Sequence, residues 1–278
     1  MKTRIIIDST TDLMPSEASR VTTVPLTVRF GDKEYVDGTE LTRQEFYKML
    51  KESETLPQTS QATPDAFMKE FEKVKEAGAE AVVITLSSKL SGTYQSANIA
   101  AGGYEGIYIV DSETASIGCA VLCERALRLL DEGKRASEIA DILNEEKKKI
   151  VTVALLDTLE NLKKGGRISK SASVAGALLN IKPVLSIENG EILLLGKARG
   201  LKMGNNLLRK EIEKAGGVDF SYPVLLGYTG ESDDLLKNYI DDSRDLWENN
   251  TEMRYTLLSG VIGTHTGAGT IGVSFFKK

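Results

Sequence analysis

The sequence predicts a mixed α/β fold with an N-terminal α/β domain on a parallel sheet and a C-terminal α+β domain whose sheet is partly antiparallel. Strands and helices alternate up to residue 150, as in a parallel sheet covered on both faces. Beyond that point the pattern changes, and a hairpin follows. A chain of 278 residues is long for one core and comfortable for two. We therefore expect domains at 1–150 and 151–278.

Composition argues against several classes of protein. The chain has 40 acidic and 35 basic residues, a net charge of −5 and only 6% aromatic residues, which disfavours a nucleic-acid-binding surface. No apolar run approaches the ~18 residues of a membrane span, and the apolar run before Asp8 is too short for a signal peptide. We expect a cytoplasmic protein.

The first strand is expected at residues 4–7, and Asp8 begins a polar turn at its end. An aspartate there suits the nucleophile of a phosphotransferase of the haloacid-dehalogenase type, but Thr10 stands where such an enzyme needs a second aspartate. A turn that caps a helix explains Asp8 equally well. Residues 22–30 alternate like one strand, and Pro25 within it favours an edge position.

A second polar cluster lies at residues 56–62, after a helix expected at 42–51. It contains Thr59 and Ser60. The next helix has Thr63-Pro64 as its cap and first position, and Gly78 ends it.

The most informative stretch is residues 81–97. An apolar strand at 81–86 ends in Ser87-Ser88, and Ser91-Gly92-Thr93 opens a helix that runs to about Ala101. Hydroxyls at the carboxyl end of a strand, beside the unpaired N–H groups of a helix, form an anion site. Serines are also ordinary turn and cap residues, and this stretch alone does not decide between the two interpretations.

A further strand at 106–110 ends in Asp111-Ser112, and helices at 119–130 and 136–149 complete the repeating pattern. Three strands thus end in polar turns, which fits one ligand-bearing edge of a parallel sheet. Cys119 and Cys123 are four residues apart on an apolar helix face and indicate core packing.

The second half begins with a strand at 151–156 and a basic loop at 163–169. This loop can hold a phosphate but lacks the spacing of a P-loop, and a glycine-terminated helix followed by a basic turn is the other interpretation. Asn189-Gly190 is typical of a type I′ hairpin turn. The hairpin spans 182–199, helices are expected at 204–214 and 232–247, and a strand is expected at 223–228.

His265 is the only histidine and lies in a glycine-rich tail, Gly263 to Gly269. Glycines at alternate positions allow the backbone to approach a ligand closely, so we favour a functional histidine over a structural one. The sequence contains no catalytic triad motif, nucleophile elbow, metal-ligand spacing or dinucleotide fingerprint. We expect no metal and no cofactor.

Taken in order, six motifs closely resemble those of the DegV family. They are Asp8-Ser-Thr-Thr-Asp12, Pro57-Gln-Thr-Ser-Gln61, Ser87-Ser-Lys-Leu-Ser-Gly-Thr-Tyr-Gln-Ser-Ala97, Lys164-Gly-Gly-Arg-Ile-Ser169, Lys182-Pro183 and Gly263-x-His265-x-Gly-x-Gly269. Each is weak alone, but all six in order cover essentially the whole chain. Ala268 departs from the proline expected in many members.

The resemblance implies a protein that binds a long-chain fatty acid, such as palmitate, in a tunnel between its two domains. Some bacterial members act as the acyl-carrying subunit of a fatty-acid kinase and present the carboxylate to a separate ATP-using subunit that makes acyl phosphate. By this resemblance the chain is a non-catalytic lipid-binding carrier in lipid metabolism, with the fatty acid as its bound ligand.

The resemblance also assigns site residues. The hydroxyls of Thr59 and Ser91 are expected to bind the carboxylate, and backbone N–H groups around Ser60 and Gly92 are expected to assist.

By the same resemblance, three further residues are expected near the head group or facing the kinase. They are Arg199, His265 and, as a looser match, Arg167.

The sequence leaves two alternative functions open. One is a stand-alone phosphotransferase or hydrolase that uses Asp8 or Ser91 as its nucleophile, and the other is a sensor whose lipid occupancy controls a protein contact.

Overall fold

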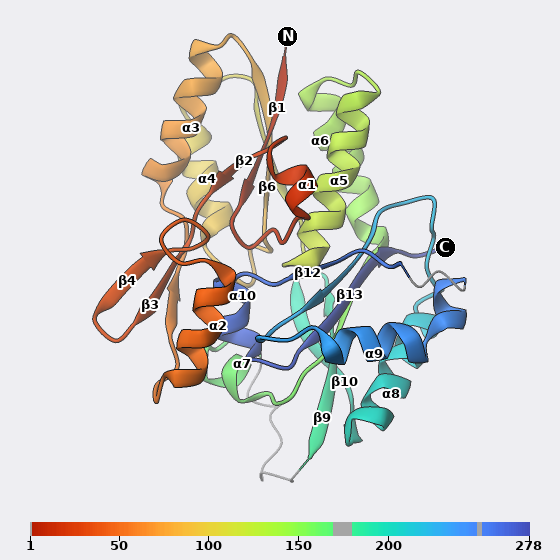
Figure 1. Cartoon of the computed structure of the whole chain (residues 1–278). Coiled ribbons are helices and arrows are strands. Elements are labelled where there is room, and N and C mark those ends of the chain that lie inside the picture. Colours follow the sequence, from red (N-terminus) through yellow and green to blue (C-terminus); the bar gives the residue numbers. More distant parts are fainter. Residues whose placement is uncertain (1, 169–179, 249–251) are drawn as a thin grey trace.

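The computed structural model describes residues 2–168, 180–248 and 252–278. Two large sheets lie one above the other in Figure 1, with a small third sheet beside them. The fold class is therefore the predicted one, a parallel α/β sheet followed by a separate mixed sheet. Ser169, the last residue of the predicted basic loop, lies outside the described residues.

The first sheet is entirely parallel, as the alternation of strands and helices predicts. Its order is β2-β1-β6-β7, with bounds Thr22–Val24 for β2, Thr3–Asp8 for β1, Glu80–Thr85 for β6 and Ile107–Asp111 for β7. Consecutive side chains of a strand point to opposite faces. Ile5 and Ile7 accordingly pack with one pair of helices, and Ile6 packs with another. The pairs are α5 (Ile117–Asp131) with α6 (Ala136–Glu146), and α3 (Pro64–Glu76) with α4 (Thr93–Ala101).

The second sheet has six strands in the order β10-β9-β8-β13-β11-β12, and among them only β11 and β12 pair in parallel. Their bounds are Glu191–Arg199, Ile181–Glu188, Ile150–Leu155, Ile271–Phe276, Val224–Tyr228 and Tyr255–Leu257. Helices α8 (Leu201–Lys214) and α9 (Asp234–Asp242), with the 3-10 turn Arg244–Trp247, cover one face. Leu225 and Phe276 belong to the other face and pack with α5. Helix α5 therefore lies between the two large sheets.

The third sheet corrects one prediction. The stretch expected as a single strand at 22–30 forms β2 in the parallel sheet and β3 (Thr27–Phe30) in a small antiparallel sheet with β4 (Lys33–Val36) and β5 (Gln58–Ser60). Pro25 lies at the break, where it has no N–H to donate to a ladder. As this proline indicates, β2 is an edge strand of its sheet.

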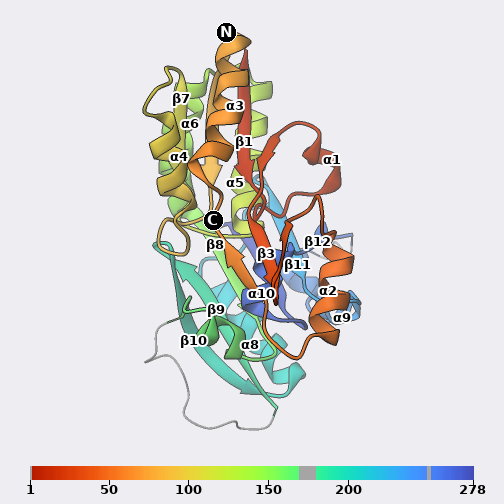
Figure 2. The same ribbon diagram turned by 90° about the vertical axis from the view of Figure 1, so that its left-hand side faces the viewer.

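The remaining described helices lie in the connections between strands. They are α1 (Pro15–Ala18), α2 (Arg43–Glu52), the 3-10 turn Lys147–Lys149, α7 (Glu160–Lys164) and α10 (Gly260–Thr266). Figure 2 shows α10 close to β3 and above α8 and β9. Across the described ranges, no helix is both long and apolar enough to cross a membrane.

The hairpin is confirmed, because Asn189 and Gly190 both have positive φ, 49° and 83°, as a type I′ turn requires. Strands β12 and β13 were not predicted from the sequence. All six residues of β13 are buried, so its sequence lacks the polar alternation that marks a half-exposed strand.

Candidate functional site

A cavity of about 410 Å³ lies between the two large sheets. Its wall is mostly aliphatic and comes from both halves of the chain. The aliphatic lining consists of Leu26, Leu86, Leu90, Ala115, Ile117, Val153, Ala154, Leu156, Leu162, Leu185, Ile187, Ile192, Leu258, Val261 and Ile262. Such a wall suits an elongated apolar ligand.

The cavity also has a polar end. Thr59, Ser60, Ser91 and Gly92, which the family resemblance assigns to the carboxylate, all line the cavity, together with His265. Ser60 is exposed, so the cavity reaches the surface at this end.

The topology explains how the Ser91 turn reaches this place. Because β1, β6 and β7 are parallel neighbours, their polar ends meet at one edge of the sheet, as predicted. Ser91 Oγ accepts a hydrogen bond from Thr93 N at 3.2 Å and lies 2.9 Å from Thr93 Oγ1. The hydroxyl is thus held at the N-terminus of α4, where the helix dipole favours an anion.

Gln61 links the two hydroxyl motifs. Its Nε2 donates to Ser96 Oγ at 2.9 Å, and its Oε1 would lie only 2.0 Å from a Cβ at Gly92. Glycine at position 92 therefore leaves room for the Gln61 side chain, and the segments that carry Thr59 and Ser91 are in contact.

His265 faces Thr59 inside the polar end. Its Nε2 lies 2.9 Å from Thr59 Oγ1, while Nδ1 is buried and has no hydrogen-bond partner among the described residues. Burial, with a smaller contribution from Arg167, lowers the pKa of His265 to about 4. The imidazole is therefore neutral at pH 7 and has one donor and one acceptor nitrogen.

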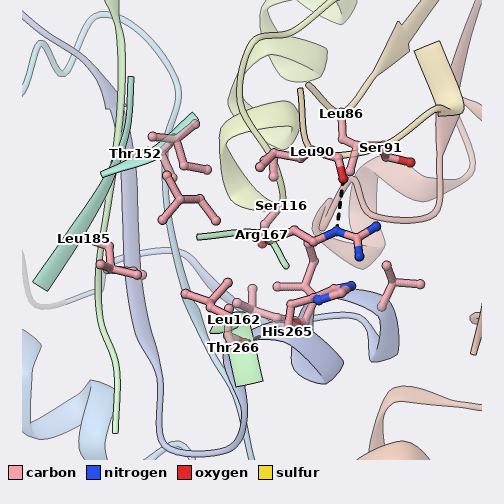
Figure 3. Close-up of a pocket in the computed structure, with 18 of the residues that line it drawn as sticks. Leu86, Leu90, Ser91, Ser116, Thr152, Leu162, Arg167, Leu185, His265 and Thr266 are labelled. Carbon is pink, nitrogen blue, oxygen red and sulfur yellow. Dashed lines mark hydrogen bonds between the residues drawn. The ribbon is translucent and has the colours of Figure 1, made fainter. Parts of the chain in front are cut away.

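Arg167 is the only arginine or lysine among the described residues that line the cavity. Its Nε donates to Leu90 O at 3.2 Å, and its Nη1 donates to Gly165 O at 2.6 Å. Figure 3 shows the guanidinium beside His265, with a dashed line to the carbonyl of Leu90. Of the two arginines that the resemblance assigns, Arg167, the looser match, is therefore the one that lies at the cavity.

Arg199 is not brought to the cavity. It is the last residue of β10, is exposed and pairs across the ladder with Ile181. The opposite end of the hairpin lies at the Ser87 turn, because Ser87 Oγ donates to Gly190 O at 2.8 Å. A full strand length therefore separates Arg199 from that turn, and the structure places Arg199 on the surface rather than among the cavity residues.

Asp8, the nucleophile of the enzyme alternative, does not line the cavity. It is fully buried, and its carboxylate accepts hydrogen bonds from Leu86 N at 2.7 Å, Thr10 N at 2.9 Å and Thr10 Oγ1 at 2.6 Å. Burial raises its pKa to about 6. These contacts fit a structural turn. Ser91, the nucleophile of the hydrolase alternative, bonds to Thr93, while His265 bonds to Thr59.

The glycines of the tail serve helix packing and turn geometry. A Cβ at Gly263 would lie 2.6 Å from atoms of both Phe46 and Tyr47, so this glycine allows α10 to pack on α2. Gly267 and Gly269 have φ of 74° and 80°, which their turn requires. Helix packing and turn geometry therefore account for these three glycines, while close approach of this backbone to a ligand stays a prediction.

The basic loop is a glycine-terminated helix. Helix α7 ends at Lys164, Gly165 caps it, and Gly166 has a φ of 71°. Gly165 also makes room for His265, because a Cβ there would lie 2.4 Å from His265 Nδ1. Within the part of the chain that the structure describes, no group of three or more His, Cys, Asp or Glu side chains is arranged to hold a metal.

Comparison with known proteins gives consistent results. A family model described as an uncharacterised protein of the DegV family matches residues 2–278. A DegV domain-containing protein of Halalkalibacterium halodurans is 35% identical over 281 residues, which cover 99% of this chain and 98% of that protein.

Among the solved structures that match the whole chain are two at about 30% identity. One, described as the fatty acid binding of a DegV family protein from Thermus thermophilus, is 30% identical with a TM-score of 0.88, and the match covers 100% of both chains. The other, a Thermotoga maritima protein described as revealing fatty acid binding function, is 29% identical with a TM-score of 0.84 and the same coverage.

Proposed function

This chain belongs to the DegV family, and from that premise we propose that it binds a long-chain fatty acid and presents the carboxylate to a separate ATP-using kinase subunit. The observation that supports this most is a single cavity with an aliphatic body and one polar end, lined by Thr59, Ser91, Arg167 and His265. A fatty acid has the matching chemistry, one anion and one long apolar tail.

The tail supplies most of the affinity in this proposal. Burying ~14 to 16 methylenes at ~0.8 kcal/mol each gives a gross gain of roughly 11 to 13 kcal/mol, from which the costs of association are subtracted. An apolar cavity between two sheets removes a tail from water on all sides.

The polar end orients the carboxylate. If His265 Nε2 donates to Thr59 Oγ1, the Thr59 hydroxyl is free to donate to a carboxylate oxygen. Ser91 at the start of α4 offers a second hydroxyl, and Arg167 supplies a positive charge nearby. Hydroxyl donors hold the anion without neutralising it fully, which leaves an oxygen able to attack the terminal phosphate of ATP held by the partner.

In this proposal the protein is a carrier without catalytic activity of its own. The fixed contacts of Asp8 and the absence of a base on the Ser91 hydroxyl in the described residues argue against a stand-alone enzyme. The purified protein alone should hydrolyse neither ATP nor esters. A steady rate that disappears with Asp8→Asn or Ser91→Ala would instead support the enzyme.

The proposal also covers domain division and location. Every strand of the first sheet precedes residue 112, and every strand of the second begins at Ile150 or later, which supports a division near residue 150.

A partner that uses ATP implies that the two proteins meet in the cytoplasm.

Native mass spectrometry tests the binding step directly. Protein purified from a heterologous host should carry an additional mass in the range of a long-chain fatty acid, and delipidated protein should bind added palmitate. Reconstitution with a fatty-acid kinase subunit and ATP then tests presentation, with acyl phosphate as the product. Delipidated protein that binds no fatty acid would refute the proposal.

A further inference from the structure

Asp12 joins three elements that are distant in the sequence. It follows β1, is 0% exposed and does not line the cavity. Its Oδ1 accepts from Ser259 N at 2.8 Å and lies 3.2 Å from Arg43 Nη2, and its Oδ2 accepts from Ser116 Oγ at 2.6 Å. These partners lie directly before α10, in the first turn of α2, and directly before α5.

Ser116 connects Asp12 with the wall of the cavity. This residue lines the cavity and has φ 60° and ψ −126°, a conformation that residues other than glycine rarely adopt. Such a backbone persists only where its surroundings hold it. The hydrogen bond from Ser116 Oγ to the buried Asp12 carboxylate is a contact of this kind.

Further hydrogen bonds hold the start of α10 and the residues before it. Next to the bond from Ser259 N to Asp12, Gly260 N donates to Asp37 Oδ1 at 3.2 Å. Arg43 also donates to Thr256 Oγ1 at 3.0 Å and to Leu257 O, and the Tyr47 hydroxyl donates to Leu258 O at 3.1 Å.

Helix α10 carries this restraint to the head-group site. It has only seven residues, Gly260–Thr266, and His265 lies in its last turn. A hydrogen-bonded helix of that length spans roughly 10 Å. A shift at its start therefore moves the imidazole, whose hydrogen bond to Thr59 tolerates little displacement.

We propose that Asp12 is a positioning residue of the head-group site, which fixes Ser116 and the start of α10 and thereby sets the hydrogen bond between His265 and Thr59. Asp12 acts through these neighbours and does not touch the ligand. The consequence for acyl-phosphate formation rests on the proposed function, but the consequence for His265 does not.

Because the chain has one histidine, nuclear magnetic resonance of histidine-labelled, delipidated full-length protein reports on His265 alone. Asp12→Asn keeps the shape of the side chain but replaces one acceptor by a donor. In this variant we expect new imidazole nitrogen shifts and a His265 pKa that rises by roughly half a unit or more towards 6.5. Palmitate affinity should stay within about threefold, while acyl-phosphate formation with a kinase subunit should fall ~10-fold.

Glu80→Gln is the matched control. Glu80 is also a buried acid paired with an arginine, at 3.0 Å from Arg135 Nη2, and it begins β6 at the edge opposite the cavity. This variant should lose stability without changing the His265 signals.

Arg43→Met is the second variant, for the case that Asp12→Asn does not fold. The Arg43 side chain is 28% exposed. Its removal takes one donor away from Asp12 and also removes the hydrogen bonds to residues 256 and 257. The His265 signals should shift in this variant too.

Two results would overturn the assignment. The first is an unchanged His265 spectrum in both Asp12→Asn and Arg43→Met. The second is an equal change in Glu80→Gln, since the effect would then reflect general loss of stability. Failure of the proposed function is distinguishable, because it appears as absent palmitate binding in the parent protein and leaves the histidine spectra unaffected.

Discussion

The aliphatic body of the cavity and its polar end are built in different ways. The body is lined largely by apolar side chains that also belong to the hydrophobic cores of the two sheets, such as Ile117, Val153 and Leu185. The polar end is assembled at strand ends and helix ends, where Thr59, Ser91 and His265 lie. This difference suggests that affinity depends on the body and chemistry on the polar end, so the two are separable by substitution.

The largest expected effect comes from filling the body. Ala154 of β8 lines the cavity, and Ala154→Phe should exclude about five methylenes of a long tail, a loss of ~4 kcal/mol in binding free energy. Titration calorimetry with palmitate and with a fatty acid several methylenes shorter measures this. Equal losses for both acids would show that the new ring does not shorten the cavity.

The next effect concerns the hydroxyls of the polar end. Thr59→Ala combined with Ser91→Ala should weaken fatty-acid binding by ~2 to 4 kcal/mol, because each change removes a hydrogen bond to a charged group. The matching fatty alcohol should lose much less. Calorimetry that finds the same loss for acid and alcohol would mean that these hydroxyls do not hold the carboxylate.

A third test separates chemistry from affinity. His265→Ala should change lipid affinity by no more than ~1 kcal/mol, since tail burial dominates binding, while acyl-phosphate formation should fall by ~10². Arg199 lies on the surface away from the cavity, so a fall in phosphate transfer by Arg199→Ala would indicate contact with the kinase subunit rather than a role at the head group. Lys197, an exposed cation on the same strand as Arg199, provides the control, and Lys197→Ala should transfer phosphate normally. If both test variants transfer phosphate at the parent rate, these residues have no part in the chemistry. If they no longer bind the fatty acid, the residues belong to the binding site.

The smallest effect concerns the neutral imidazole. The pKa of His265 is about 4 in the folded protein and about 6.5 in an unfolded chain. Between pH 4 and pH 6.5 the imidazole is therefore protonated in the unfolded chain but neutral in the folded protein. The stability that depends on neutral His265 is therefore complete above pH 6.5 and is lost as the pH falls towards 4.

Chemical denaturation of the parent and His265→Gln proteins measures this contribution. The free energy of unfolding of the parent should fall by about 2 kcal/mol more than that of the variant between pH 7 and pH 5. Asp8 and Asp37, whose pKa values burial raises to about 6 and about 7, titrate in both proteins and so cancel in the difference. A constant difference would show that His265 titrates normally.

Much of the first half of the fold follows from local pattern. The strand at Glu80–Thr85 and the helix from Thr93 are confirmed almost residue by residue, because an apolar run, a polar turn and a cap follow one another. Pro25 marked an edge strand correctly, but nothing local indicates that the chain changes sheets there.

The site was harder to predict because its contacts are not local. Thr59 and His265 are separated by 206 positions, and no periodicity in the sequence relates them. Ser116 lacked any signal, since its role depends on a backbone conformation and on Asp12. Arg167 had a visible signal in its glycine-rich loop, but whether it faced a phosphate, a carbonyl or solvent depended on packing with the Leu90 turn.

Helix α5 has a consequence for folding. Eleven of its fifteen residues are buried, and its apolar side chains pack with strands of both large sheets. If the chain were cut near residue 150, the first half would keep this helix with an uncovered apolar face, and the second sheet would lose its cover. Each half has buried apolar residues of its own, but the core around α5 is shared by both halves. We therefore expect the two sheets to unfold as one cooperative unit although their strands are separate in the sequence.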